Sequence, residues 1–484
     1  MTSFIRTQFL VIFLLVMGGC NFAPDYEQPA LPVDNYYPTP PIETPDDDSS
    51  PSVSADAIGW REFFKDKRLQ ALIELAIHHN RDLKTAILKI EEARLLYQVQ
   101  NTDLFPTIGI NAFYNRTKTA QNLTPANTPS LSNRFEGTLN ITAYELDVFG
   151  RVRNLTDAAY AQYQASAEAW RATHIALVAE VANAYFMERS LYEQLEVSKR
   201  ILQARKEYYI LIKQRYEIGI SDALTLKEQE TSFRAAEVAV NQLTWQWAQA
   251  LNALTLLVGK SFRDLPTPTL LSAQQFLQNL RAHLPSDLLL RRPDIRQAEQ
   301  LLIAANANIG AARAAFFPSI TLSTSYGTAN NELSNFFKSG TEVWTVAPQL
   351  LVSIFDWGRN MDNLDLSKIR NEMAITQYEK VIQTAFREVA DALTARGALD
   401  AQLQAQTLYR NAASERLNLV EKVLHNGINS NLDFLDAQRD LLSAELSLIQ
   451  VQQLCLSNTI NLYKALGGGI YETLHVEVAQ KGRL

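Results

Sequence analysis

The chain has 484 residues, of which 47% are hydrophobic and 20% are charged, so its composition excludes a disordered polymer and allows several domains or one elongated molecule. The formal net charge is −7, whereas nucleic-acid binders usually carry a basic surplus. No nucleic acid is therefore expected among its partners.

The N-terminus is predicted to direct the chain out of the cytoplasm. Arg6 precedes an apolar run at 9–17, which is too short to cross a bilayer as a helix because a crossing needs about 20 residues. This pattern, followed by small residues, is typical of a secretory signal peptide, here 1–19. Cys20 follows two glycines and resembles the lipidated cysteine of a bacterial lipobox, and Asn21 beside it implies the outer membrane. A plain signal peptide with an incidental cysteine is the alternative.

Residues 20–59 are predicted to form a lipidated, extended arm. Residues 21–58 hold eight of the seventeen prolines and an acidic run, a composition that buries little apolar surface. The only other cysteine, Cys455, lies in a helical-looking segment and is expected to be a small buried hydrophobe. No cysteine cluster occurs, and His78 and His79 are adjacent rather than one helical turn apart, so no metal site is expected.

From residue 60 onward the chain is predicted to consist of two structural repeats. "DLFPTIGI" at 103–110 matches "AFFPSITL" at 315–322 with an offset of 212, and "EVANAY" matches "EVADAL" further on with an offset of 208. Self-similarity at such a distance indicates two copies of one unit. The predicted boundaries are a first repeat at 60–285, whose final segment is 259–285, a second repeat at 286–466, and a tail at 467–484.

Each repeat is predicted to contain a pair of very long helices, at 151–258 and at 358–466. The first helix of each pair has no proline and reaches about 100 Å at 1.5 Å per residue. A glycine follows each, Gly219 and Gly427, where we expect the turn to the second helix. Helices this long need lateral support, so the alanines at every seventh residue from Ala158 either form a close-packing seam or simply favour helix.

Four short segments are predicted to be β-strands, at 106–115, 134–146, 318–327 and 344–356. In the second segment, Phe135 and Leu139 share one face, whereas Glu136 and Thr138 share the other. Strands of this length with one apolar face suit a transmembrane β-barrel. A soluble sheet packed on one side is the alternative.

The unpaired edges of a four-stranded sheet favour an assembly of several chains. Four strands cannot close a membrane barrel, because the known minimum is about eight strands and lipid does not tolerate open sheet edges. Several chains are therefore expected to share one barrel. Pro348 in the last strand predicts a bulge or an irregular pairing there, since proline has no N–H to donate.

Together these motifs resemble those of the TolC-like outer-membrane factors, in particular the lipoprotein branch that serves drug-efflux pumps. The resemblance covers nearly all of the mature chain and rests on "GGC", "PDYEQP", the paired "FP" strand starts, "FGR" and "WGR" where a strand passes into a helix, and the turns "YEIG" and "LHNG". It implies a mainly α fold with a small membrane β part. Three chains would form a twelve-stranded β-barrel continued by a periplasmic α-helical barrel, with 259–285 and 467–484 in its equatorial region.

The resemblance implies a passive exit duct for drugs or other small molecules. A periplasmic adaptor, contacting the helix-tip turns at Gly219 and Gly427, would connect it to an inner-membrane pump. Neither catalysis nor a cofactor is expected, because the chain has no glycine-rich nucleotide loop, no HExxH and no G-x-S-x-G. The alternatives are the outer-membrane duct of a type I protein secretion system, and a structural lipoprotein that spans the periplasm without a pore.

The resemblance also implies a gate at the closed periplasmic end. Asp433, Asp436 and Asp440 lie at i, i+3 and i+7 and so share one helix face. Family members narrow the pore with aspartates at the positions that match Asp433 and Asp436. Leu432 and Leu435 are expected to contribute packing to this constriction. The alternative is a solvated acidic face in which Asp436 or Asp440 pairs with a nearby arginine.

Overall fold

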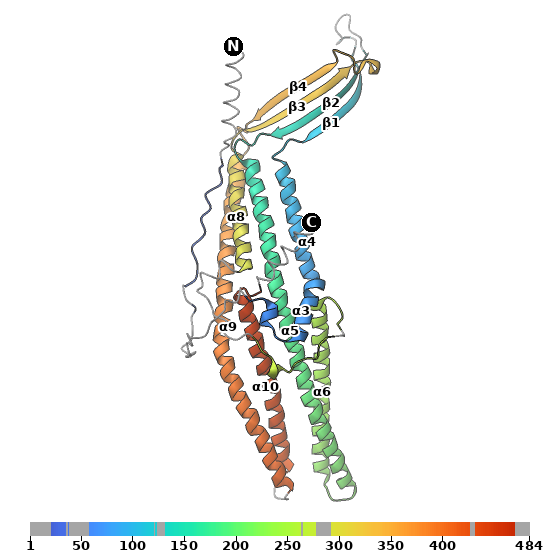
Figure 1. The fold of residues 1–484 in the computed structure, drawn as a ribbon, viewed down its shortest axis with the longest axis vertical. Coiled ribbons are helices and arrows are strands. Elements are labelled where there is room, and N and C mark those ends of the chain that lie inside the picture. The colour runs from blue at the N-terminus through green and yellow to red at the C-terminus, as the bar shows by residue number, and fades with distance from the viewer. Residues whose placement is uncertain are drawn as a thin grey trace. The chain divides into compact units, whose positions relative to one another are not determined.

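The computed structural model of the chain describes residues 21–34, 37, 58–120, 122, 131–262, 265–276, 292–425 and 431–469. The elements are, in chain order, α2 (Trp60–Phe63), α3 (Lys67–His79), α4 (Arg81–Thr102), β1 (Ile108–Lys118), β2 (Leu131–Glu145), α5 (Arg151–Glu217), α6 (Ala223–Val258), η3 (Leu271–Ala273), α8 (Pro293–Ala314), β3 (Ser319–Asn330), η4 (Leu333–Asn335), β4 (Glu342–Leu351), α9 (Arg359–His425) and α10 (Asn431–Ala465) (Figure 1). The predicted fold class, mainly α with a small β part, is confirmed.

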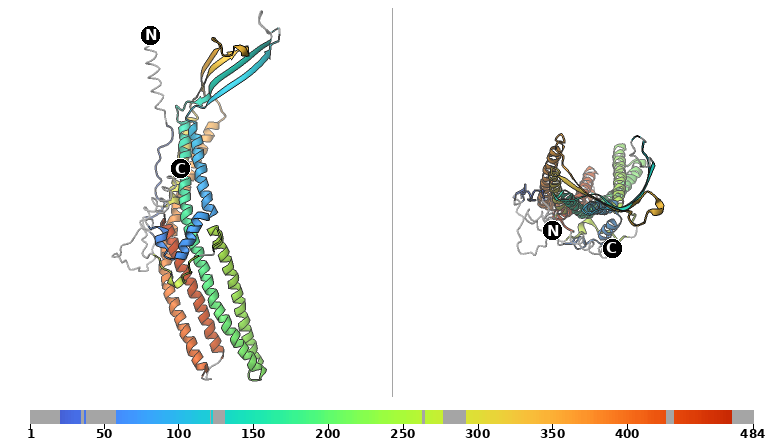
Figure 2. Two further views of the ribbon diagram at one scale, coloured as in Figure 1. Left: turned by 45° about the vertical axis from the view of Figure 1, so that its right-hand side comes forward. Right: turned by 90° about the horizontal axis from the view of Figure 1, so that it is seen from above.

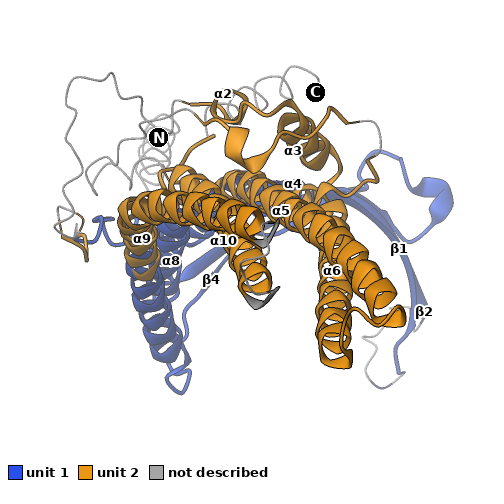
Figure 3. Cartoon of the chain, turned by 90° about the horizontal axis from the view of Figure 1, so that it is seen from below, with its two compact units in different colours: residues 1–30, 89–167, 297–379 blue, residues 31–88, 168–296, 380–484 orange. Residues whose placement is uncertain are grey.

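Contacts within the chain divide it into two compact units (Figure 3). The first unit, residues 1–30, 89–167 and 297–379, contains all four strands. The second unit, residues 31–88, 168–296 and 380–484, is helical and contains α3, α6 and α10 entirely.

The strands of the first unit form one curved antiparallel sheet in the order β1-β2-β3-β4 (Figure 2). β2 pairs with β3, so the strand pair of one repeat continues directly into that of the other. The strand ends differ from the prediction, because β1 extends to Lys118 and β2 begins at Leu131. β4 ends at Leu351 rather than at 356, since the chain beyond it already turns toward α9 and leaves the ladder.

The predicted irregularity at Pro348 is wrong. Pro348 pairs in register with Leu322, and β4 continues through it. β4 is an edge strand of this sheet, and an edge strand accepts proline because only one side of its backbone pairs with a neighbour. The irregularity lies in β2 instead, where pairing with β3 shifts between Ile141 and Tyr144 and Ala143 has a φ of 51°.

Small side chains bring two helices of the first unit together. Ala158 and Ala161 of α5 form a buried cluster with Ala304 and Ala307 of α8, and Ile303 packs against it. Side chains three residues apart share a helix face, so this cluster lets the two backbones approach closely. The interpretation of Ala158 as part of a packing seam is therefore confirmed.

In the second unit, a side chain donates a hydrogen bond to a carbonyl at the end of a long helix in two matching places. The side-chain amide of Asn80 donates to the carbonyl of Leu257 at 2.8 Å, and the guanidinium of Arg292 donates to the carbonyl of Ala465 at 3.0 Å. The donors are separated by 212 residues and the acceptors by 208, which are the offsets of the sequence repeats. Arg292 also forms an ion pair with Glu388 at 2.8 Å, so the second of these contacts involves charged groups, whereas the first involves the neutral Asn80.

The long helices of the second unit are supported from the side, as their length requires. Tyr209 of α5 stacks on Phe233 of α6 with ring centroids 5.6 Å apart. The side chain of Gln406 in α9 donates to the Ala444 carbonyl of α10 at 3.2 Å. None of the described helices is both long enough and apolar enough to cross a bilayer.

Candidate functional site

One face of the sheet carries a continuous apolar row. The pairing register places Ile110, Leu139, Tyr326 and Trp344 side by side on the four strands. All four side chains are exposed, and Ile110 keeps 84% of its surface accessible. Directly paired residues point to the same side of a sheet, so the row is a band of exposed apolar groups across its whole width. Such a band suits contact with an apolar phase rather than with water.

The opposite face of the sheet is polar. The neighbouring row, one residue away on each strand, faces this side, and the pairing register places in it Gly109, Asn140, Ser325 and Thr345. Thr138, on the same face as Asn140, is buried even within the single chain. Because alternate residues of a strand face opposite sides, each strand carries one apolar and one polar surface. The sheet is thus built to separate an apolar environment from an aqueous one.

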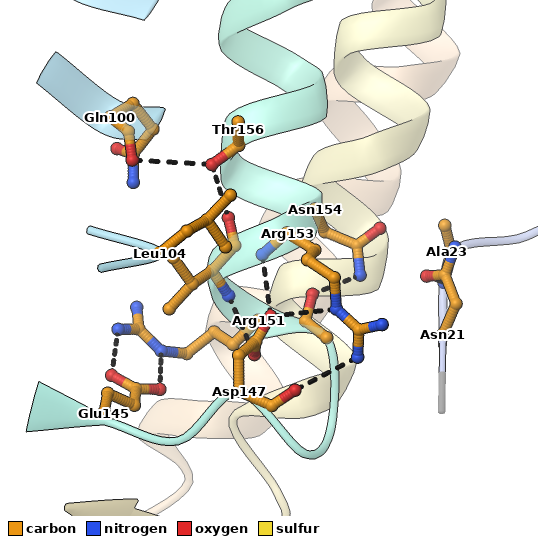
Figure 4. Close-up of polar contacts among 12 residues, drawn as sticks. Asn21, Ala23, Gln100, Leu104, Glu145, Asp147, Arg151, Arg153, Asn154 and Thr156 are labelled. Atoms are coloured by element: carbon orange, nitrogen blue, oxygen red, sulfur yellow. Dashed lines mark hydrogen bonds and ion pairs between the residues drawn. The ribbon is translucent and has the colours of Figure 1, made fainter. Parts of the chain in front are cut away.

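At the first junction, where β2 passes into α5, the turn is fixed by charged groups (Figure 4). The guanidinium of Arg151 donates to both carboxylate oxygens of Glu145, at 2.8 and 2.5 Å. The Asp147 carboxylate accepts the backbone N–H groups of Val152 at 3.1 Å and of Arg153 at 2.8 Å. These bonds satisfy donors that a helix start otherwise leaves unpaired, and the negative charge favours the helix N-terminus. The first junction therefore draws its support from its own residues.

A cavity of about 190 Å³ lies beside the first junction. Its walls include the charged groups of Asp147 and Arg151 and the rings of Phe149 and Phe317. Pockets for drug-sized ligands usually measure about 300–1,000 Å³. The cavity is therefore smaller than a typical pocket for a drug-sized ligand.

The second junction, where β4 passes into α9, has the same glycine–arginine turn with different support. The Asp356 carboxylate accepts the backbone N–H groups of Gly358 at 3.1 Å and of Asn360 at 3.0 Å. Trp357 and Gly358 adopt φ values of 60° and 87°, in the left-handed region where only glycine is unstrained. The side chains of Ile354 and Trp357 are 95% and 86% exposed. This junction presents apolar groups outward.

The start of the arm is docked on the first unit. The ring of Phe22 stacks on Phe317 with centroids 4.5 Å apart, and Phe317 in turn stacks on Phe149 at 5.0 Å. The backbone of the arm comes so close to Gly310 that a Cβ there would lie 2.7 Å from the nitrogen of Ala23. A glycine is thus required at position 310 for the arm to lie in this place.

Further along, the arm is held by two side-chain hydrogen bonds. The Tyr26 hydroxyl donates to Glu299 at 3.2 Å, and the Gln28 amide donates to the Tyr378 hydroxyl at 2.9 Å. Burial and the neighbouring Glu299 carboxylate raise the pKa of Tyr26 above its ordinary value, so this donor stays protonated. Cys20 itself lies outside the described residues.

The turn after α5 has the conformation expected of a helix C-terminus. The N–H of Ile220 donates to the carbonyl of Arg215 at 2.8 Å, and the N–H of Gly219 donates to that of Tyr216 at 3.0 Å. Gly219 has a φ of 79°, so these bonds form a Schellman motif with glycine at its left-handed position. The turn presents exposed apolar residues, Ile218 and Ile220. Gly427, the corresponding glycine of the second repeat, lies outside the described residues.

Asp222 starts the helix that follows this turn. Its carboxylate accepts the backbone N–H of Thr225 at 2.8 Å and the hydroxyl of Thr225 at 2.9 Å. These bonds stabilise the ionised form, so the pKa of Asp222 is lowered, first by the backbone bond. The tip of this helix pair is therefore a fixed structure.

The predicted gate residues lie at the start of α10. Asp433 is exposed, and Asp436 and Leu435 are partly exposed, whereas the side chain of Leu432 lies outside the described part. Asp436 pairs with Arg439 at 3.1 Å, and Asp440 pairs with Arg416 of α9. Of the three aspartates, only Asp433 makes no ion pair with an arginine among the described residues of the single chain.

Two features of the site were missed by sequence reasoning. Docking of the arm depends on Phe22 and Gly310, which are 288 residues apart and show no joint pattern. The pair of Glu145 with Arg151 spans a turn whose geometry the sequence does not reveal. Only the second feature left a signal in the sequence. The arginine of "FGR" recurs in "WGR", whereas Glu145 is replaced by Ser353 at the matching position of the second repeat.

Comparison with known proteins gives a consistent answer. The model of the family described as outer membrane efflux protein matches residues 72–260 and 284–468, one match for each repeat. The probable efflux pump outer membrane protein TtgC of Pseudomonas putida is 42% identical over 96% of this chain and 95% of its own length. The outer membrane protein OprJ of Pseudomonas aeruginosa is 37% identical over 98% of both chains.

Solved structures agree with this result. A crystal structure of the open state of the MtrE outer membrane channel from Neisseria gonorrhoeae matches with a TM-score of 0.84 and 39% identity, covering 93% of this chain and 99% of that one. A crystal structure of CusC matches with a TM-score of 0.81 and 35% identity over 93% and 100%. The two repeats, the two-faced sheet and these similarities together show that the chain belongs to the family of outer membrane efflux proteins.

Proposed function

We propose that this protein is the outer-membrane exit duct of a tripartite efflux system, passively conducting drugs or other small molecules. The observation that carries the proposal is the two-faced sheet, whose apolar row suits lipid while its polar face suits a water-filled lumen. The relatives named as efflux pump outer membrane proteins support the same function. A periplasmic adaptor and an inner-membrane pump would deliver the cargo. The proposed duct needs neither a catalytic residue nor a cofactor.

The functional unit is proposed to be a homotrimer. β1 and β4 are the edge strands of the four-stranded sheet, and each needs a partner from another chain if the sheet crosses lipid. Three chains would supply twelve strands, an even number within the range of known membrane barrels. The helix pairs of the three chains would continue the barrel into the periplasm.

Conductance in planar bilayers tests the duct. The purified protein should produce discrete conductance steps that persist in both polarities, because a water-filled lumen conducts ions. A structural lipoprotein without a pore would insert or adsorb without any steps. Absence of conductance from protein that is folded and membrane-inserted would contradict the proposal.

The gate is proposed to lie at Asp433 and Asp436, narrowed further by Leu432 and Leu435. Three chains would place three carboxylates at each aspartate level, and their mutual repulsion would favour bound cations. The ion pair of Asp436 with Arg439 competes with this role, because it neutralises one carboxylate of each pair.

Cation block of the channel tests the gate. Asp433→Ala combined with Asp436→Ala should weaken block by divalent or trivalent cations added on the periplasmic side. Arg439→Gln should strengthen it, because the substitution releases Asp436. Asp440→Ala is the matched control and should change block less than the double variant, since Asp440 pairs mainly with Arg416 and lies 3.9 Å from Arg439. Normal block in a correctly assembled double variant would exclude these residues as the gate.

Adaptor contact is proposed at the helix tips that carry Gly219 and Gly427. The exposed apolar side chains of Ile218 and Ile220 give the first tip a surface that a partner would cover. Ile220→Asp should therefore reduce binding of the purified adaptor, whereas Lys227→Ala on the exposed side of α6 should not. Equal binding by both variants would place the contact elsewhere.

Lipidation is proposed at Cys20. Cys20→Ser should abolish labelling by palmitate and still allow insertion of the barrel, because strands and not an acyl chain span the membrane. Label retained by this variant would exclude Cys20 as the modified residue.

A type I protein secretion duct is the second candidate, because the same fold would serve it. Loss of the gene should raise drug accumulation in the cell if the efflux proposal is right. Loss of an exported protein from the medium, with unchanged drug accumulation, would favour secretion.

A further inference from the structure

The connection between β3 and β4, residues 331–341, is a loop closed by several side-chain hydrogen bonds, and we call it the outer loop. The hydroxyl of Thr328 donates to the Phe336 carbonyl, and that of Thr341 donates to the same carbonyl at 3.1 Å. The side-chain amide of Asn330 donates to the carbonyl of Asn335 at 3.1 Å. These bonds, with a left-handed glycine at 340, hold the outer loop in one conformation. The outer loop lies at the end of the sheet opposite the two helix junctions.

The outer loop folds back over the apolar face of the sheet. A Cβ built on Gly137 of β2 would lie 3.0 Å from the ring of Phe336, so this ring covers Gly137. Gly137 is two residues from Leu139 and therefore faces the same side as the apolar row. Tyr114 and Phe135, stacked at 4.6 Å on β1 and β2, also face this side.

The outer loop exposes two large apolar side chains. Phe337, next to the ring that covers Gly137, is 88% exposed, and Leu333 is 66% exposed. Phe336 and Phe337 meet edge to face with centroids 4.9 Å apart, so the partly buried ring of Phe336 supports the exposed ring of Phe337. Such exposure of a phenylalanine is unfavourable in water, and it recurs on the side of the sheet that is already apolar.

The position of the outer loop along the barrel axis matches that of the interface between membrane and water. From Ser319 to Thr328, which pairs with Gly137, β3 rises about 3.3 Å per residue. With a tilt of about 40°, nine steps correspond to roughly 23 Å along the barrel axis, close to the apolar band of about 25 Å in known membrane barrels. Glu342, on the apolar side beyond Trp344, carries a charge at this level, and Lys338 follows Phe337 directly in the outer loop. An apolar group flanked by charges is the arrangement expected at the boundary between acyl chains and headgroups.

We propose that the outer loop is a preformed lipid hook, which inserts Phe337 and Leu333 among the acyl chains of the outer leaflet. The inference rests on the proposed insertion of the sheet in the membrane. Its partner is the upper part of the acyl region, with Lys338 at the level of the headgroups. Because the hydrogen bonds of the outer loop hold Phe337 in place before insertion, little conformational freedom is lost when the ring meets lipid.

Depth-dependent quenching tests the hook in the full-length protein, reconstituted in phospholipid vesicles. Single cysteines are introduced in a Cys455→Ser background as Phe337→Cys, Lys338→Cys and Leu139→Cys, and each is labelled with the environment-sensitive dye NBD. Lipids with a nitroxide high on the acyl chain should quench the dye at 337 at least twofold more than at 338. The dye at 139, on the apolar row, should also be quenched and reports insertion of the sheet.

The outcomes separate the hook from the function on which it rests. Quenching at 139 together with equal, weak quenching at 337 and 338 would overturn the hook and leave the duct intact. Lack of quenching at all three positions would overturn insertion and the hook with it. A second variant, Gly137→Leu in the Phe337→Cys protein, should displace Phe336 and reduce quenching at 337, and an unchanged value would contradict the packing on which the hook depends.

Discussion

The two strand-to-helix junctions share a glycine–arginine turn and an aspartate that accepts two backbone N–H groups, but their other side-chain contacts differ. At the first, Arg151 pairs with Glu145, and Phe149 stacks on Phe317 of the same chain. At the second, Arg359 has no ion pair among the described residues, because Ser353 stands where the first junction has Glu145. The side chains of the first junction are paired within the chain, whereas the second junction exposes the apolar side chains of Ile354 and Trp357.

The difference follows the sequence position by position. At the offset of 208, the second junction has Phe355 for Asp147, Trp357 for Phe149 and Met361 for Arg153. All three substitutes are exposed in the single chain. They follow directly on β4, an edge strand that needs a partner from another chain in the proposed trimer. The duplicated motif thus keeps its turn in both repeats, whereas the side chains around the turn are polar and paired in the first copy and apolar and exposed in the second.

The largest effect is expected at the second junction. Phe355→Ala combined with Trp357→Ala should weaken trimer assembly by about 2–4 kcal/mol per interface, the size typical of buried aromatic residues in contacts. The secondary structure of the single chain should be retained, because both rings are exposed there. Analytical ultracentrifugation in detergent measures the assembly, and an unaffected trimer would show that these rings serve another purpose.

A second contrast between the repeats lies further along the long helices. His174 of α5 is buried, and its Nδ1 makes no hydrogen bond among the described residues, whereas the matching position in α9 is the buried Ile382. Burial lowers the pKa of His174 to about 4, so the folded state favours the neutral ring.

Stability should accordingly fall as the pH drops from 6.5 toward 4, the window between the unfolded and folded pKa values of His174. The loss attributable to this group reaches about 3 kcal/mol at the acid end. His174→Ile, which copies the second repeat, should remove that part of the acid sensitivity, as thermal melts at several pH values would reveal. Identical pH profiles for the variant and the parent would contradict the role of burial.

A smaller effect is expected from the arginines of the two turns. Arg151→Met should lower the free energy of unfolding by about 1–2 kcal/mol, because it leaves the partly buried Glu145 carboxylate without its charged donor. Arg359→Met should change it by less than about 0.5 kcal/mol, as for an ordinary surface substitution. Urea titrations of the two variants provide the comparison, and equal losses would remove the distinction between the junctions.

The smallest effect is expected from the arm. Phe22→Ala removes the ring that stacks on Phe317 and should cost about 1 kcal/mol. Gly310→Val should release the same segment by blocking the approach of Ala23, and it also crowds the buried side chain of Asn154 in α5. Faster cleavage of the arm by protease is the expected result in both variants, with an unchanged core in Phe22→Ala, and unchanged protection would contradict the docking.

Sequence reasoning recovered the features that depend on periodicity. Helix starts at Arg151 and Arg359, and the turn at Gly219, follow from proline-free stretches bounded by glycine, and the two faces of the strands follow from alternation. Membership of the family followed from short motifs, among them "FGR" and "WGR", which recur in the two repeats at an offset of 208 residues.

Features that depend on contacts between distant residues were not predictable. The end of β4 at Leu351 depends on where β3 begins, and alternation alone extends it to Phe355. Pro348 was expected to disturb the strand because its position at the edge of the sheet was unknown. The ion pair of Asp436 with Arg439 was recognised as an alternative, and only the side-chain geometry shows it formed within one chain.

The mass of the folded protein in detergent tests the central claim most directly, namely that a four-stranded sheet with open edges is completed by other chains. Native mass spectrometry of the purified protein should give three chain masses, with each chain close to the 54.4 kDa of the full sequence less its signal peptide. A stable, folded monomer that retains the four-stranded sheet would contradict the shared barrel.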